Sequence, residues 1–133
     1  MRHSDHRLGH ETLDAQHLLL FGLITELQSE IELGRGRAAL ADVLRRLFLY
    51  VAVHFATEDQ LMIESDYPDA QDHRAEHEAV IANLKRLEAA FQGGEPSAPR
   101  DTLRFMTTWA SGHIANRDRR LVEHLLKAKA GAI

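Results

Sequence analysis

Three short segments that contain glycine or proline, at residues 34–36, 65–69 and 93–99, divide the chain into four stretches. Glycine and proline end helices, because glycine adopts left-handed backbone conformations and proline lacks a backbone donor. Within each stretch, apolar residues recur at spacings of three and four, the period of an amphipathic helix. The sequence therefore predicts helices over about 12–33, 37–64, 69–92 and 98–128, preceded by a polar N-terminal arm over 1–11.

Connections this short favour antiparallel neighbours. We therefore expect an all-α, up-down-up-down antiparallel four-helix bundle that forms one domain over residues 1–133. A chain of 133 residues with 44% hydrophobic and 27% charged residues can bury a core of its own.

Composition also narrows the function classes. The chain has no cysteine, which excludes disulfides, zinc–thiolate sites and iron–sulfur clusters and predicts a cytoplasmic protein. No apolar run approaches the roughly 20 residues that span a bilayer, so we expect no membrane insertion. The net charge of −4 and the lack of a long basic run argue against nucleic acid as a partner.

Histidine is the second unusual feature, with nine residues in the chain. Side chains four residues apart share one face of a helix and can reach one metal ion. Two such pairs lie inside predicted helices: His54 with Glu58, and His73 with His77. Imidazole and carboxylate groups bind iron, zinc or manganese. One pair alone is weak support, because His6 and His10 have the same spacing and are interpreted as part of the polar arm.

Depth in the bundle gives stronger support for a metal site. His17 is near the start of the first predicted helix, Glu58 near the end of the second, and His73 near the start of the third. These positions meet at one end of an antiparallel bundle, together with the later part of the fourth helix. There Asp118 follows His113 by five residues, which rotates it by about 140° on an α-helix. Spacing alone therefore does not choose Asp118 over Glu123.

Four stretches of the chain resemble the hemerythrin family, in particular the small single-domain bacterial hemerythrins. They are LDAQHLLLF (Leu13–Phe21), HFATEDQLM (His54–Met62), YPDAQDHRAEH (Tyr67–His77) and WASGHIANRD (Trp109–Asp118). The resemblance covers nearly the whole chain. It departs from the family pattern in lacking the usual tryptophan before the first helix.

The resemblance implies a centre of two non-haem iron ions that binds dioxygen reversibly. It implies that His73, His77 and His113 bind one iron, that His17 and His54 bind the other, and that Glu58, Asp118 and an oxygen bridge join the two. With these ligands one iron is six-coordinate and the other keeps an open position for dioxygen.

Residues near these ligands in sequence are candidates for the surroundings of the centre. The candidate walls of an oxygen pocket are Leu20, Phe55, Trp109 and Ile114, for which ordinary core packing is the alternative interpretation. Asp14, one turn before the first histidine of the set, could accept a hydrogen bond from a ligand histidine, or it could have a capping or surface role.

Two other functions fit the same ligands. One is a di-iron enzyme acting on peroxide, nitric oxide or ferrous iron, and the other is a redox or oxygen sensor. A ferritin-like enzyme would carry two Glu-x-x-His motifs, and this sequence has none. We therefore expect an oxygen carrier, store or delivery protein rather than an enzyme, with any delivery partner unidentified.

Overall fold

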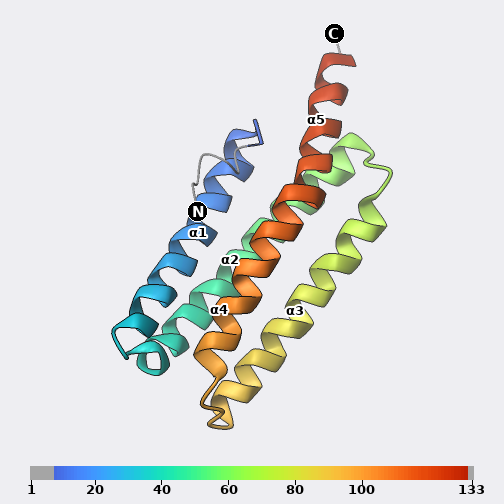
Figure 1. Ribbon diagram of the computed structural model, residues 1–133. Coiled ribbons are helices and arrows are strands. Elements are labelled where there is room, and N and C mark those ends of the chain that lie inside the picture. The colour runs from blue at the N-terminus through green and yellow to red at the C-terminus, as the bar shows by residue number, and fades with distance from the viewer. Residues whose placement is uncertain (1–7, 132–133) are drawn as a thin grey trace.

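Helices account for nearly all of the computed structural model, which describes residues 8–131 apart from the side chains of residues 114, 115, 130 and 131. The first three are α1 (Glu11–Glu32), α2 (Gly36–Ser65) and α3 (Ala70–Gln92). The fourth is made of three consecutive helical segments, α4 (Ala98–Trp109), η2 (Ala110–Asp118) and α5 (Arg119–Gly131), and each of the four long helical units of the bundle is called a rod below. Successive rods run in opposite directions (Figure 1), so the predicted all-α four-helix bundle is confirmed.

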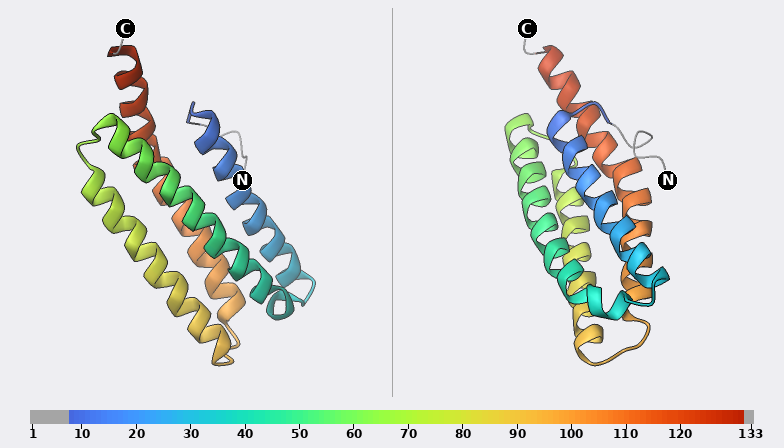
Figure 2. Two further views of the ribbon diagram at one scale, coloured as in Figure 1. Left: turned by 180° about the vertical axis from the view of Figure 1, so that it is seen from behind. Right: turned by 90° about the vertical axis from the view of Figure 1, so that its left-hand side faces the viewer.

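The fourth rod differs from the uninterrupted helix predicted over residues 98–128. Its middle segment, η2, is a π-helix, and its last helix continues to Gly131, beyond the ends of the other rods (Figure 2). A π-helix closes its turns with i→i+5 hydrogen bonds, so it places more residues in each turn than the 3.6 of an α-helix. Apolar periodicity over a few residues does not reveal this change.

The main core fills the bundle along most of its length, from the end opposite the α2–α3 connection up to the region of Phe55. Each rod contributes fully buried apolar side chains to it, such as Leu20, Leu40, Leu84 and Met106. Burial of each such side chain stabilises the fold by about 1.5–3 kcal/mol. Across residues 8–131, none of the helices combines the length and hydropathy needed to cross a bilayer.

A smaller apolar cluster of Met62, Tyr67 and Leu121 lies at the end of the bundle where α2 meets α3. Along α2, Glu58 lies between Phe55 of the main core and Met62 of this end cluster. A buried polar layer thus separates two apolar ones, and this layer holds the candidate site.

The start of α1 is capped by His10, whose Nδ1 accepts a hydrogen bond from the backbone N–H of Leu13 at 3.2 Å. Satisfying one of the free donors at a helix start is the usual role of a capping side chain. The end of the predicted polar arm therefore forms the cap of α1. His6 lies outside the described residues.

Candidate metal centre

Seven side chains predicted as ligands come together in one buried layer. They are His17 on α1, His54 and Glu58 on α2, His73 and His77 on α3, and His113 and Asp118 on η2. None of these seven residues is more than 5% exposed. The starts of α1 and α3 lie at the same end of the bundle as the end of α2 (Figure 1), as the antiparallel arrangement predicts.

The carboxylate of Asp118 lies between two groups of histidines. Its Oδ2 is 2.8 Å from Nε2 of His17 and 3.3 Å from Nε2 of His54. Its Oδ1 is 2.8 Å from Nε2 of His113 and 3.4 Å from Nε2 of His73. Each oxygen thus faces a different group, as in a carboxylate that bridges two cations.

The carboxylate of Glu58 lies on the other side of the same histidines. Its Oε1 is 2.9 Å from Nε2 of His77 and 3.1 Å from Nε2 of His73. The same oxygen is 3.4 Å from Nε2 of His54. Its other oxygen, Oε2, is buried and has no hydrogen-bond partner in the described part of the chain.

These donor atoms fit a metal ion. Two ligand atoms at right angles, each about 2.1 Å from a cation, are about 3 Å apart, which is close to the separations of this layer. Oε2 of Glu58 and Oδ1 of Asp118 are buried acceptors that a cation would satisfy. Imidazoles with carboxylates suit a borderline cation such as iron. The structure therefore places a suitable donor set in a closed, buried space.

The charges of this layer depend on one another. Burial and the charge of Asp118 raise the pKa of Glu58. Hydrogen bonds from the imidazoles of His113, His73 and His77 outweigh both effects and lower this pKa to about 2. Burial also raises the pKa of Asp118, yet its histidine partners hold that pKa well below its usual range. Burial lowers the pKa of His113, but the carboxylates around it raise it to about 11. Both carboxylates are thus ionised at neutral pH, and a cation would compete with the proton on His113.

The π-helix η2 explains how His113 and Asp118 reach the same layer. Residues five apart diverge on an α-helix, but i→i+5 hydrogen bonds bring them close to one face. Asp118 is completely buried, whereas Glu123, the alternative left open by spacing, is exposed on α5. The local backbone therefore selects the carboxylate.

Two hydrogen bonds orient histidines of the layer from outside, and sequence reasoning missed both. Nδ1 of His113 is 2.7 Å from Oε1 of Glu76, whose other oxygen pairs with Nε of Arg117 at 2.7 Å. Nδ1 of His54 is 2.7 Å from Oε1 of Gln16. An acceptor at Nδ1 holds the proton there and leaves Nε2 free for a metal. Each acceptor lies on a neighbouring helix, so helical spacing could not identify it.

The prediction that Asp14 hydrogen-bonds a ligand histidine is wrong. Its carboxylate instead accepts the backbone N–H groups of Leu8, at 2.8 Å, and Gly9, at 3.1 Å. Asp14 lies in the first turn of α1, where the free backbone donors before the helix are nearest. It therefore fixes the approach of the chain to α1.

Two of the predicted wall residues lie against histidines of the layer. The ring of Phe55 stacks on that of His77, with centroids 3.7 Å apart and planes at 5°. The ring of Trp109 lies 5.3 Å from that of His113. Both aromatic side chains are at most 8% exposed, and they shield the histidines of α3 and η2 from water.

The other two candidate wall residues are Leu20 and Ile114. Leu20 is completely buried in the main core, and the side chain of Ile114 lies outside the described residues. On the α1–α2 side, Tyr50 stacks on His54, with ring centroids 5.4 Å apart and planes at 11°. Sequence reasoning missed Tyr50, although its position one turn before His54 could have indicated it.

Comparison with known proteins relates most of the chain to one family. The sequence model of the hemerythrin HHE cation binding domain matches residues 8–125. A bacteriohemerythrin of Methylococcus capsulatus is 31% identical over 106 residues, which are 80% of this chain and 80% of that protein. A bacteriohemerythrin of Pseudomonas aeruginosa is 31% identical over 115 residues, or 86% of this chain and 73% of that protein. A myohemerythrin of Riftia pachyptila is 29% identical over 114 residues, or 84% and 82% of the two chains.

Proposed function

The chain belongs to the hemerythrin family, and from that premise we propose that it binds dioxygen reversibly at a non-haem di-iron centre. Two ferrous ions at such a centre supply the electrons for reversible oxygenation. The observation that carries the proposal is the buried layer of five imidazoles and two carboxylates, drawn from every rod of the bundle.

Our assignment of ligands follows the two histidine groups around Asp118. We propose that one iron is held by His73, His77 and His113, that the other is held by His17 and His54, and that Glu58 and Asp118 bridge them. The division of the two Asp118 oxygens between the groups supports this assignment. The unpaired Oε2 of Glu58 is the atom that would complete the second bridge.

The unequal number of histidines supports binding of a small exogenous molecule. With two carboxylate bridges and one oxygen bridge, three histidines would complete six ligands at one iron. Two histidines would leave the other iron one ligand short, and this open position would be available to dioxygen. A site dominated by histidine differs from the carboxylate-rich sites of ferritin-like enzymes, which favours an oxygen carrier over an oxygenase.

The surroundings of the layer favour release of intact dioxygen. Phe55 and Trp109 keep water from the histidines of α3 and η2. Burial, together with the charges of Asp118 and Glu58, raises the pKa of the Tyr50 hydroxyl. A phenol in this environment keeps its proton at neutral pH, so it is a poor source of protons for a bound molecule.

A visible absorption titration tests the proposal. The reduced, iron-loaded protein should gain a charge-transfer band when dioxygen is added and lose it when the solution is degassed. The iron content should be two ions per chain. Immediate and irreversible conversion to a ferric spectrum would refute carriage and favour the enzyme alternative. Whether the protein stores oxygen or delivers it, and its cytoplasmic location, stay predictions.

A further inference from the structure

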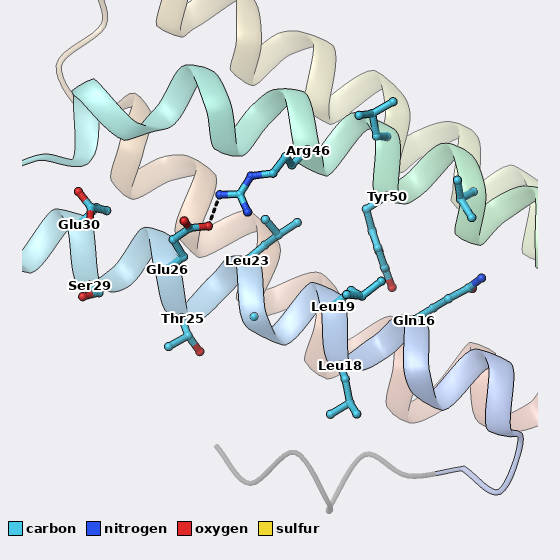
Figure 3. Close-up of a pocket in the computed structure, with 13 residues that line it drawn as sticks. Gln16, Leu18, Leu19, Leu23, Thr25, Glu26, Ser29, Glu30, Arg46 and Tyr50 are labelled. Atoms are coloured by element: carbon cyan, nitrogen blue, oxygen red, sulfur yellow. Dashed lines mark hydrogen bonds and ion pairs between the residues drawn. The ribbon is translucent and has the colours of Figure 1, made fainter.

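An apolar groove of about 980 Å³ runs between α1 and α2 (Figure 3). Its lining includes large side chains that are more than half exposed: Leu19, Leu49 and Val53. Two of the lining residues, Glu26 of α1 and Arg46 of α2, form an ion pair that joins the two helices. Exposed apolar side chains gathered in one groove indicate a surface that receives an apolar molecule.

The inner wall of the groove is also the outer wall of the candidate metal centre. Tyr50 and Gln16 both line the groove, and both contact His54. Tyr50 covers one face of the His54 ring, and Gln16 accepts the hydrogen bond from its Nδ1 at 2.7 Å. Gln16 is in turn tied to Thr57 of α2 by a 3.0 Å hydrogen bond. One layer of side chains therefore separates the groove from a proposed iron ligand.

The groove lies on the two-histidine side of the proposed centre. The proposed ligands of the five-coordinate iron, His17 and His54, are on α1 and α2, the two helices that form the groove. On the side of α3 and η2, the rings of Phe55 and Trp109 lie against His77 and His113, and the Phe55 ring also lies 6.0 Å from that of His54. The groove therefore adjoins the proposed histidine ligands of the five-coordinate iron.

Gly22 leaves extra room in the groove. It lies in the middle of α1, where glycine costs roughly 1 kcal/mol relative to alanine. A Cβ atom added at this position would meet nothing within 4 Å, so packing does not require the glycine. The open space that it leaves forms part of the groove.

The hydroxyl of Tyr50 is available to an arriving molecule. It is buried and has no hydrogen-bond partner among residues 8–131. An unsatisfied buried hydroxyl costs about 1–3 kcal/mol, which a hydrogen bond to a bound molecule would offset. The residue as a whole is 8% exposed, so its ring closes the inner wall of the groove.

We propose that dioxygen reaches the two-histidine side of the centre through the α1–α2 groove, with Tyr50 as the gate between the groove and His54. The inference rests on the dioxygen binding proposed above. Dioxygen is small and apolar, which matches a lining of leucine and valine side chains better than it matches a charged surface.

The test fills the groove without touching the centre. Gly22→Phe adds a large side chain where a Cβ meets open space, and Gln28→Phe adds the same side chain at an exposed position of α1 outside the groove. A blocked route slows binding and release equally. We expect Gly22→Phe to lower the association and dissociation rates of dioxygen together, by about tenfold, with no change in Kd. Gln28→Phe should leave both rates at wild-type values.

Opening the gate should have the opposite effect. Tyr50→Ala removes the inner wall, so both rates should rise relative to the wild type. Stopped-flow mixing and flash photolysis of the oxygenated protein measure the two rates. Rates in Gly22→Phe equal to those in Gln28→Phe, with an intact oxygenation spectrum, would overturn the route alone. Failure of the wild type to oxygenate reversibly would instead overturn the proposed function.

A second measurement does not depend on oxygen chemistry. Crystals of the iron-loaded protein pressurised with xenon should show xenon in the groove beside Tyr50, because xenon binds apolar cavities. The xenon should be displaced in Gly22→Phe and kept in Gln28→Phe. A groove without xenon in the wild type would overturn the proposal.

Discussion

The carboxylate of Glu76 supports the imidazole of His113 from the side away from the candidate centre, at 2.7 Å from Nδ1. The side chain of His113 is completely buried, and that of Glu76 is 28% exposed. Glu76→Ala removes the acceptor while leaving every proposed ligand in place. The variant therefore isolates the contribution of this hydrogen bond to metal affinity.

The size of the effect follows from the kind of bond that is lost. A hydrogen bond to a charged group contributes about 1.5–3 kcal/mol. With a tenfold change in affinity for about every 1.4 kcal/mol, Glu76→Ala should weaken metal binding about 10- to 100-fold. The ion pair of Glu76 with Arg117 adds at most about 1 kcal/mol, because the Arg117 side chain is 38% exposed. Glu76→Gln keeps a neutral acceptor and should lose about three- to tenfold.

Competition with a ferrous chelator under anaerobic conditions measures these affinities. Glu78→Ala is a matched control, because Glu78 is an exposed glutamate on the same helix, two residues away. Thermal unfolding of the metal-free variants would show whether the fold is equally stable in both. If Glu76→Ala competed for iron as well as Glu78→Ala does, the hydrogen bond would have no role in holding His113 and the reasoning would be refuted.

Two further predictions concern η2 and the charges of the centre. Deleting Gly112 should restore an α-helix with His113 and Asp118 still five residues apart, about 140° from each other, and should abolish iron loading measured by metal analysis. Deleting Asn116 instead shortens the spacing of His113 and Asp118 to four residues, which an α-helix keeps on one face. This variant should therefore bind more iron than the Gly112 deletion. Equal iron loading of the two deletion variants would contradict the role of the π-helix. In the metal-free protein, the pKa of Glu58 is lowered from 4.5 to about 2, so its contribution to stability is complete above pH 4.5 and is lost as the pH falls toward 2. Denaturant unfolding over this range should show a weaker pH dependence in Glu58→Gln than in the wild type, and identical slopes would count against the lowered pKa.

The fold and the family were predicted from the sequence, and both predictions are confirmed. Helical periodicity and three breaks leave few arrangements for four short-linked helices, and antiparallel packing then brings fixed positions to one end. His17, Glu58 and His73 meet for this reason alone. Their metal-binding roles stay predictions, because the presence of suitable donors does not by itself identify the ion.

Contacts between helices could not be predicted in the same way. Helical spacing relates residues of one helix, whereas Gln16 and Glu76 act on histidines of their neighbours, and their contacts depend on how each helix is rotated about its axis. The same limitation explains the wrong prediction for Asp14, whose nearest free donors lie just before α1 rather than on a histidine.

The sequence by itself determined a bundle of four helices with a histidine-rich layer at one end, because periodicity, breaks and residue types are local properties. Only the tertiary structure decided which carboxylate completes that layer. The i→i+5 turns of η2 bring Asp118 to the face of His113 and leave Glu123 in solvent. The groove beside Tyr50 likewise exists only where α1 and α2 pack together, since no single helix forms it.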